Sequence, residues 1–404
     1  MTGLGEAPRV GHRGASRPGC GRPAEQDRSY DMVLQRNADG GAQRIAIILH
    51  DFASGGTERI IIRLANLWAA AGRDVTILCG SEAGPARGLV GAGVAVCETI
   101  PATPRAIGSR RRLAQRLLHA FSERHYDVIV GPGNYHLPIL ANLISRGVTI
   151  PIVAKLSNPL ERADLGSLSR ALFRRAKRAQ AKGTAQLVTM SQALAVEARR
   201  TIPSVPISVI PEPIIDRPLA PLDMKPDATT PRLLVAGRLV PQKRVALALQ
   251  MLAAWHRRDA RLTIVGDGPE RAALEQLAMK LDIADRVYFA GQVPDLAPWF
   301  AEADVLLSTS TYEGYPAILV EAIVAGVPVV TTASSVALPE ILCDASFGAI
   351  ATAEPTALAT ALDTLLSGPP VDETARLALA ARHEASTSAK RWLDLLDRVV
   401  ADRG

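Results

Sequence analysis

The feature that most constrains this chain is an alternation of short apolar runs with helix-like segments, repeated in two separate series. The runs are rich in Val, Ile and Leu, and such continuous apolar strands are typical of parallel sheets covered by helices on both faces. A segment rich in Pro and Asp, residues 213–231, separates the two series. The sequence therefore predicts an α/β chain with two doubly wound, Rossmann-like domains. The predicted strands are IAIILH, DVTILC, YDVIVG, IPIVAK, AQLVTM and SVPISVI, then PRLLVAG, ARLTIVG, DRVYFAG, ADVLLS and VPVVTT.

Residues 1–43 precede the first predicted strand and differ from the rest in composition. They are rich in Gly, Arg and Pro and have no hydrophobic period, so we expect a disordered basic leader. A second methionine, Met32, stands near the first strand. We therefore expect that deleting residues 1–31 leaves activity intact. The first domain is expected at 44–215, and the second begins at 216.

The chain shows no signal for crossing or leaving a membrane. No stretch approaches the roughly 18 apolar residues of a transmembrane helix. The first 40 residues lack the apolar centre of a secretory signal. We predict a cytoplasmic protein.

Two glutamates, Glu313 and Glu321, stand in the stretch STSTYEGYPAILVEAIVAGVPVV. We expect Glu313 on a loop at the end of a buried strand, and Glu321 about two turns inside the helix that follows. Pro316 suits the first turn of that helix, because a proline lacks the N–H that is unpaired there. Two carboxylates that bracket a helix N-terminus could hold hydroxyls of a ligand whose phosphates lie at that N-terminus. The alternative is an ordinary exposed pair on a surface helix.

Other polar residues follow the neighbouring strands of the second series. GRLVPQKR places Arg238 and Lys243 just beyond a strand end, where two cations suit a diphosphate. The alternative for them is a surface loop with solvated cations. Since the carboxyl ends of parallel strands share one edge of a sheet, we expect these residues to meet there. The residues predicted to line this site are Gly237, Arg238, Lys243, Asp267, Gly268, Gln292, Val293, Gly314, Tyr315 and Pro316 with the two glutamates.

The first domain has a glycine pair after its first strand, Gly55 and Gly56, followed by a helix to about Ala71. The pair would open the helix N-terminus to a phosphate or a sugar. Neither a GxGxxG fingerprint nor a GxxxxGK[ST] loop is present, which disfavours dinucleotide binding and ATP hydrolysis.

The two halves differ in charge. Residues 44–215 carry 22 Lys and Arg against 11 Asp and Glu, whereas residues 216–404 carry 18 against 24. Two basic stretches, 105–116 and 168–182, hold most of the excess, and the second reads as an amphipathic helix able to lie on an anionic membrane. The alternative is a helix packed on its own sheet with a solvated basic face. Nucleic acid is not expected, because aromatic residues are only 4% of the chain.

With these motifs assembled, residues 44 to about 400 resemble the retaining glycosyltransferases of family 4, which have the GT-B fold. The resemblance rests on SGGTERIIIRLANLWAAAGRDVTIL, GRLVPQKR, IVGDGPE and STYEGYPAILVEAIVAGVPVV. It implies two Rossmann-like domains facing each other across a cleft. The first would bind the acceptor, and the second, 216–384, would bind a nucleotide diphosphate sugar. The last segment, 385–404, looks like the family's closing helix, which crosses back to the first domain.

The resemblance also implies roles for individual residues. Glu313 would face the hydroxyls of the donor sugar and Glu321 the ribose, while Arg238 and Lys243 would stabilise the departing diphosphate. His136 matches a position where the family often places a histidine near the transferred sugar. No metal or other cofactor is implied.

Two positions of the chain depart from the family or vary within it. Glu212 stands where the family usually has asparagine, and Tyr315 occupies a variable position that could tune the choice of donor.

The resemblance implies transfer of a hexose-type sugar, with UDP-sugar as the expected donor and GDP-sugar next. The acceptor would be lipid-linked or a saccharide in cell-surface glycan synthesis, with peripheral binding at the inner face of the plasma membrane. A GT-B epimerase or phosphorylase, and a non-catalytic sugar-nucleotide-binding subunit, are the alternatives. The motifs GRLVPQKR and Glu-x7-Glu argue against both.

Overall fold

The computed structural model describes residues 41–53, 55–160, 166–216 and 230–403. Within them the chain forms two sheets whose strand pairs are all parallel, as the two apolar series predict. Almost all of the predicted leader, and most of the Pro-rich junction, lie outside the described residues.

The first sheet has the strand order β3-β2-β1-β4-β5-β6-β7. Its central strand β1 pairs with β2 on one side, Ile45 opposite Val75, and with β4 on the other, Ile45 opposite Val128. The chain reverses its direction of winding between β1 and β4, which is the switch point of a doubly wound sheet. Its strands are β1 Arg44–Leu49, β2 Asp74–Cys79, β3 Val94–Glu98, β4 Val128–Gly131, β5 Ile152–Lys155, β6 Gln186–Thr189 and β7 Ile207–Val209.

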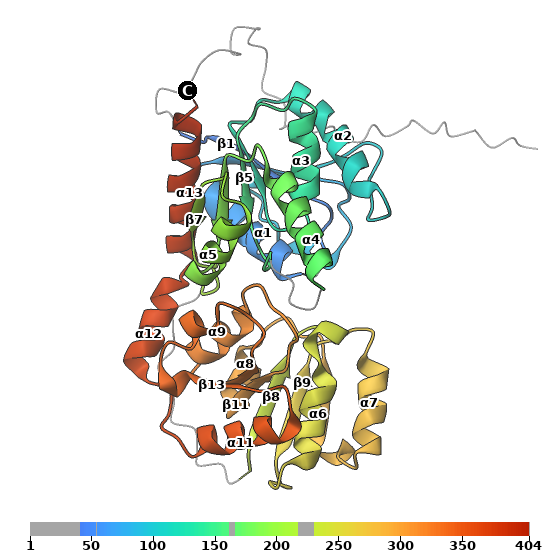
Figure 1. Cartoon of the computed structure of the whole chain (residues 1–404), viewed down its shortest axis with the longest axis vertical. Helices are drawn as coiled ribbons and strands as arrows, with labels where there is room; N and C mark the ends of the chain where they lie inside the picture. Colours follow the sequence, from blue (N-terminus) through green and yellow to red (C-terminus); the bar gives the residue numbers. More distant parts are fainter. Residues whose placement is uncertain (1–40, 54, 161–165, 217–229, 404) are drawn as a thin grey trace, which may run out of the picture. The chain divides into compact units, whose positions relative to one another are not determined.

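Helices cover both faces of this sheet. One core contains Ile45, Ile47 and Leu49 and packs against α1 and α13. The other contains Ala46 and Ile48 and packs mainly against α2 and α3. Figure 1 shows α3 beside both α2 and α4. The helices are α1 Gly56–Ala70, η1 Pro85–Leu89, α2 Ser109–Glu123, α3 Leu137–Ser145, α4 Ser167–Ala181, α5 Gln192–Thr201 and α13 Ala385–Ala401.

The second sheet repeats the same winding, in the order β10-β9-β8-β11-β12-β13. Its switch point lies between β8 and β11. One face packs against α6, α7 and α11, and the other against α8, α9, α10 and α12. Its strands are β8 Arg232–Ala236, β9 Arg261–Val265, β10 Val287–Gly291, β11 Val305–Ser308, β12 Val329–Thr332 and β13 Gly348–Ala351. Its helices are η2 Pro241–Lys243, α6 Val245–Ala254, α7 Arg271–Lys280, η3 Ala284–Arg286, α8 Ala297–Glu302, α9 Ala317–Val324, α10 Leu338–Ile341, η4 Ala345–Phe347, α11 Pro355–Leu366 and α12 Glu373–Arg382.

Two strands were absent from the sequence prediction, β3 and β13. Both lie at an edge of their sheet, where a strand pairs on one side only. Their apolar runs, VAVC and GAIA, are short and contain Ala and Gly, and a short run of this kind does not by itself distinguish a strand from a helix or a loop.

The final helix α13 packs on the first sheet although it follows the second in sequence. The Trp68 indole N–H donates to the carbonyl of Ala389, and the rings of Trp68 and Trp392 lie 6.0 Å apart. Asp397 accepts from the Ala42 N–H and forms an ion pair with Arg73.

No helix of the described residues is both long and apolar enough to span a bilayer.

Candidate functional site

A cavity of about 2210 Å³ extends over the second domain and includes the carboxyl ends of β8, β9, β10 and β11. It is lined by residues that follow each of those strands, together with the first turn of α1 and the 157–158 loop of the first domain. The polar residues that follow these four strands therefore line one cavity. We refer to this cavity as the main pocket.

Lys243 and Glu313 form an ion pair in the main pocket, with Nζ 2.6 Å from Oε1. Both side chains are partly buried. Several hydrogen bonds hold their two loops together. The Thr309 hydroxyl donates to the carbonyl of Lys243, the Thr311 N–H donates to the carbonyl of Gln242, and the Gln242 amide donates to the carbonyl of Tyr312. Sequence reasoning placed the cation and the carboxylate at one edge but gave no sign that they pair.

Arg238, unlike Lys243, is unpaired among the described residues. It is exposed in the pocket wall and has no ion pair or side-chain hydrogen bond with any described residue. The N-terminal end of α9 is similar. The main-chain N–H groups of Gly314, Tyr315 and Ile318 have no hydrogen-bond partner among the described residues. A free guanidinium and free N–H groups at a helix N-terminus favour an anion between them. Pro316 is the residue before the helix rather than in its first turn.

Two glycines allow the loops of this pocket to approach closely. Gly266 has φ +138°, and a Cβ there would lie 1.9 Å from the carbonyl oxygen of Gly237. A Cβ at Gly314 would lie 1.7 Å from the carbonyl oxygen of Ser157, in the first domain. No larger residue fits either position without moving a main chain.

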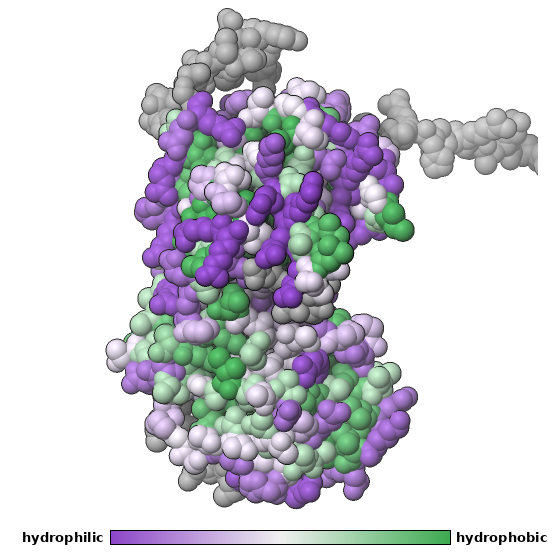
Figure 2. Space-filling model, in the orientation of Figure 1, coloured by the Kyte–Doolittle hydropathy of each residue, from purple (hydrophilic) through white to green (hydrophobic). Residues whose placement is uncertain are grey.

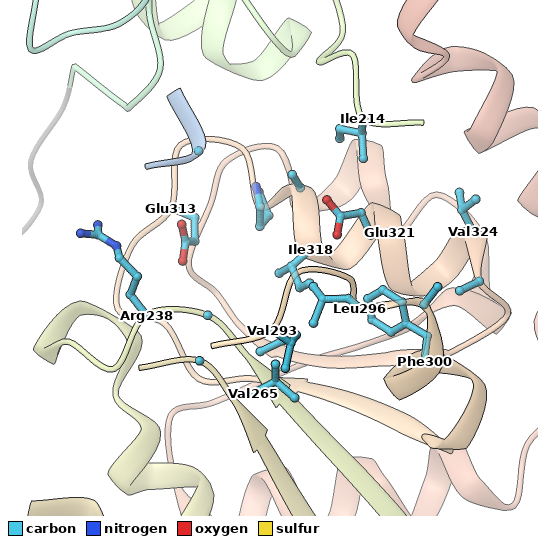
Figure 3. Close-up of a pocket in the computed structure, with 18 of the residues that line it drawn as sticks. Ile214, Arg238, Val265, Val293, Leu296, Phe300, Glu313, Ile318, Glu321 and Val324 are labelled. Carbon is cyan, nitrogen blue, oxygen red and sulfur yellow. The ribbon is translucent and has the colours of Figure 1, made fainter. Parts of the chain in front are cut away.

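Glu321 projects into the main pocket from α9 (Figure 3). The sequence had suggested a position about two turns inside the helix. The helix begins at Ala317, so Glu321 lies in its second turn. Its carboxylate has no hydrogen-bond or ion-pair partner among the described residues. Burial raises its pKa, and Arg63 and Arg59 of α1 partly oppose that rise. Figure 3 shows Arg238 and Glu313 at one end of the pocket, Glu321 at the other, and apolar side chains including Val265, Val293, Leu296 and Phe300 beneath.

The remaining predicted residues of the second domain also line the main pocket. Gln292 and Val293 follow β10, and the main-chain groups of Val293 have no hydrogen bond to another described residue. Asp267 is exposed and accepts from the N–H of Gly268, so its carboxylate closes its own turn. Gly237, Gly268 and Pro316 are in the wall as well.

Tyr315 lines the pocket, but its hydroxyl is engaged elsewhere. His383 Nδ1 lies 3.2 Å from the carbonyl oxygen of Glu212, which can only accept, so Nδ1 carries the proton. The Tyr315 hydroxyl then donates to Nε2 of His383 at 2.9 Å. Burial lowers the pKa of His383 to about 4, which keeps the ring neutral, and burial raises that of Tyr315. The geometry therefore gives Tyr315 a structural role and does not support one in donor choice.

Glu212, the unusual residue at the domain junction, is buried and pairs with the buried Lys155, Nζ to Oε1 2.5 Å. Each charge compensates the other in a place where a lone charge would be costly. The same junction is held by Arg63 of α1, which donates to the carbonyls of Pro213 and Ile214 and pairs with Asp216. Sequence reasoning missed Arg63, because its partners lie some 150 residues away.

The first domain contributes the start of α1 to the main pocket. Gly55, Gly56 and Thr57 line it, and the N–H groups of Gly56 and Thr57 have no partner among the described residues. Arg59 is exposed in the wall with no side-chain hydrogen bond or ion pair to a described residue.

His136 is not among the residues that line the main pocket. It is 1% exposed, and neither ring nitrogen has a hydrogen-bond partner among the described residues. Burial, with Arg105 and His50 adding to it, lowers its pKa to about 3. The catalytic role that the resemblance implies for His136 stays a prediction, and the geometry does not support it.

A cluster of charged groups lies beside His136, at the switch point of the first sheet. Arg105 donates to Asp51 at 2.5 Å and to Glu58 at 3.0 Å, and its guanidinium lies 4.6 Å from the ring centre of Tyr135. Burial by itself raises the pKa of Asp51, but the adjacent His50 ring and the hydrogen bond and charge of Arg105 outweigh it and bring the pKa to about 2. Sequence reasoning missed this cluster, since Arg105 is 54 residues from Asp51.

Comparison with known proteins agrees with this architecture. Two family models match: "Glycosyl transferase 4-like domain" over residues 55–213 and "Glycosyl transferases group 1" over residues 230–368. Among solved structures, HepE of Anabaena in complex with UDP and glucose superimposes with a TM-score of 0.65 at 21% identity, covering 89% of this chain and 99% of that one. At that identity the likeness concerns the fold.

Curated relatives match over shorter segments. A GDP-mannose-dependent alpha-(1-6)-phosphatidylinositol dimannoside mannosyltransferase of Mycobacterium tuberculosis is 37% identical over 142 residues, 34% of this chain and 36% of that protein. The lipopolysaccharide core biosynthesis glycosyltransferase LpsE of Rhizobium meliloti is 35% identical over 120 residues, 30% of this chain and 34% of that protein. The matches thus span about a third of these relatives' own length.

Taken together, the two family models and the two doubly wound sheets define a GT-B glycosyltransferase architecture. The chain belongs to the family 4, or group 1, glycosyltransferases.

Proposed function

We propose that this protein transfers a hexose-type sugar from a nucleotide diphosphate sugar to an acceptor, with retention at the anomeric carbon. The observation that carries the proposal is the unpaired positive end of the main pocket. Arg238 and the free N–H groups of Gly314, Tyr315 and Ile318 lie there beside the Lys243–Glu313 pair. As the bond from the anomeric carbon to the diphosphate breaks, negative charge builds on the leaving oxygen, and donors fixed in advance lower that barrier.

The Lys243–Glu313 pair offers a cation for the diphosphate of the donor and a carboxylate for its sugar. With the donor bound, Lys243 would turn its charge to the diphosphate, and Glu313 would accept hydrogen bonds from sugar hydroxyls. Glu321 would accept from the ribose hydroxyls, and the base would lie on the apolar floor near Val293 (Figure 3). The acceptor oxygen would attack from the face that the diphosphate leaves. We propose no metal or other cofactor, so treatment with a chelator should leave the rate unchanged.

A UDP-sugar is the donor we propose first, in line with the UDP and glucose in the HepE structure. A GDP-sugar is the second candidate, because the mycobacterial relative is named as GDP-mannose-dependent. Thermal-shift measurements with a panel of nucleotide sugars would separate them, since a specific ligand stabilises the fold by mass action. Equal shifts with UDP, GDP and ADP sugars would contradict a dedicated donor site.

We propose a lipid-linked or saccharide acceptor in cell-surface glycan synthesis, bound on the first domain. The net positive charge of residues 44–215 and the name of the LpsE relative support it. The decisive measurement is release of nucleoside diphosphate with and without such an acceptor. Release that requires the acceptor and yields a glycosylated product supports the proposal. Conversion of the donor without an acceptor would indicate an epimerase, and binding without turnover would indicate a non-catalytic subunit.

We also propose peripheral binding to an anionic membrane surface through α4. Only Ala181 of this helix is buried, while Leu168 and Leu172 are 74% and 60% exposed. A helix that packed on its own sheet would bury its leucines, so this exposure favours the membrane over that alternative. Sedimentation with anionic liposomes tests the idea. A variant with Arg174, Arg175 and Arg178 changed to Glu should remain in the supernatant, and binding equal to wild type would refute it.

A further inference from the structure

A second, smaller cavity lies at the C-terminal end of α4. It has a volume of about 530 Å³, and we refer to it as the α4-end pocket. Four of its lining residues are cationic and none is acidic. The lining residues are Arg175, Arg178, Ala179, Lys182, Gly183, Thr184, Ser204, Val205 and Arg403.

The α4-end pocket is separate from the main pocket. Thr184 and Val205 precede β6 and β7 by a few residues, so they lie at the amino ends of those strands. The main pocket is lined mainly by residues of the second sheet's domain, and no lining residue is common to both cavities. A ligand here would not be the sugar nucleotide.

Two of the four cations have structural partners and two do not. Arg178 donates through Nε to the carbonyl of Thr201, and Arg403 donates to the carbonyl of Thr149. Arg175 and Lys182 have no ion pair or side-chain hydrogen bond with a described residue. Cations at a helix C-terminus are favourable in themselves, because the last carbonyls are unpaired. The unpaired carbonyls of α4 would not by themselves explain why Arg403, which lies outside α4, also lines this cavity.

Thr184 supplies an observation that is independent of charge. The residue is 6% exposed, and its hydroxyl oxygen is buried with no hydrogen-bond partner among the described residues. A buried hydroxyl without a partner costs about 1–3 kcal/mol. Thr184 lines the α4-end pocket, and a ligand oxygen that reached this hydroxyl would remove that cost.

An exposed apolar stripe leads along α4 to this pocket. Leu168 and Leu172 are exposed near the start of the helix, and Arg175, Ala179 and Lys182 continue the same stripe at spacings of three and four. Figure 2 shows hydrophilic side chains over most of the α4 and α5 face, with a hydrophobic patch at one end of α4. Apolar side chains next to cations suit a lipid surface, where acyl chains lie beside phosphates.

We propose that the α4-end pocket is a phosphate-binding site, in which Arg175, Lys182 and the hydroxyl of Thr184 hold the oxyanion. The phosphate is that of an anionic phospholipid headgroup or a free phosphate, and both have the same recognition chemistry. The site does not depend on the transfer reaction, so binding measurements test it even if the proposed activity is wrong.

The first arm of the test is calorimetric titration of the full-length protein with inorganic phosphate and pyrophosphate at low ionic strength. The second is flotation with vesicles of phosphatidylcholine, alone or mixed with phosphatidylglycerol. Lys182→Ala and Thr184→Val are the test variants, and Arg111→Ala, which removes an exposed cation of α2, is the matched control. Thr184→Val keeps the shape and removes only the hydroxyl, so it should fold at least as well as wild type.

We expect Lys182→Ala and Thr184→Val to weaken binding about tenfold in at least one arm, as befits a lost hydrogen bond to a charged group. Arg111→Ala should leave that binding unchanged. A lipid headgroup is identified if Lys182→Ala and Thr184→Val lose binding to vesicles. A Leu168→Ser/Leu172→Ser variant should then lose vesicle binding too, while it still binds phosphate. Loss in the phosphate arm alone identifies a soluble phosphate. The proposal is overturned if neither arm detects binding, or if Arg111→Ala weakens binding as much as Lys182→Ala does.

Discussion

The two sheets of this protein share one winding, yet their ligand-binding edges are built in different ways. At the switch point of the first sheet, Arg105 is neutralised by Asp51 and Glu58. At the edge of the second, Arg238 and the N–H groups at the start of α9 have no partner among the described residues, and Lys243 has one carboxylate. The Arg105 cluster of the first edge is electrostatically satisfied by itself, whereas the donors at the second edge are left to be satisfied by a ligand.

This difference shows that the topology of a sheet determines where a site can form but not which ligand the site binds. Both edges offer strand ends, glycines and a helix N-terminus, as doubly wound sheets do. Which charges remain available depends on whether a neighbouring loop supplies counter-charges. The 99–108 loop does this for the first edge by carrying Arg105 to two carboxylates.

The largest effect is expected from removing the charged groups of the second edge. Lys243→Ala, Arg238→Ala and Glu313→Gln should each lower kcat about 100- to 1,000-fold, because each removes charge stabilisation or donor positioning. Steady-state kinetics with donor and acceptor measures this. Lys280→Ala, which removes an exposed cation on α7, is the control. Near wild-type turnover in the Lys243 or Glu313 variant would contradict the assignment of the site.

A glycine at each edge offers the next comparison. Gly266→Ala should destabilise the protein by about 3 kcal/mol, since it combines a positive φ with a clash against the main chain of Gly237. Gly56→Ala should change stability by less than about 0.5 kcal/mol, because a Cβ there meets nothing within 4 Å. Urea denaturation of both variants measures the difference. Equal stabilities would mean that the second edge is less tightly packed than its geometry indicates.

Removing Arg105 should destabilise the protein, because Asp51 and Glu58 would lose their counter-charge. Arg105→Met leaves Asp51 and Glu58, which are 15% and 10% exposed, without their cation. We expect a loss of about 1–2 kcal/mol, less than for a fully buried pair because the Arg105 side chain is 39% exposed. The KM for the donor should not change. The double variant Arg105→Met/Asp51→Asn should recover part of the stability, and no recovery would show that Arg105 acts through packing alone.

At neutral pH the smallest effect is expected at the junction, where it appears only as a pH dependence of stability. The pKa of His383 is about 4 in the folded protein and about 6.5 when unfolded. The unfolded chain therefore binds a proton that the folded chain does not, and stability is lost as the pH falls from about 6.5 to 4. His383→Gln should reduce this loss in urea titrations across that range. His119→Gln, at a side chain that is 79% exposed, should leave the profile unchanged. An unaltered profile in the His383 variant would contradict a neutral His383.

The sequence by itself determined the fold class, the internal strands and the residues of the second edge. These follow from local information. Continuous apolar runs mark buried parallel strands, and residues that directly follow such strands must gather at one edge. The strands β3 and β13 were missed because their apolar runs, VAVC and GAIA, are too short to distinguish a strand from a helix or a loop.

Only the tertiary structure decided which charges meet. It paired Lys243 with Glu313, surrounded Arg105 with Asp51 and Glu58, and gave the Tyr315 hydroxyl to His383. It also placed His136 outside the main pocket and gathered Lys182, Thr184 and Arg403 into the α4-end pocket. The physical reason is that a Coulomb or hydrogen-bond interaction depends on distances of a few ångströms between atoms far apart in sequence. Periodicity specifies which face a residue occupies, whereas packing of distant segments specifies its partner.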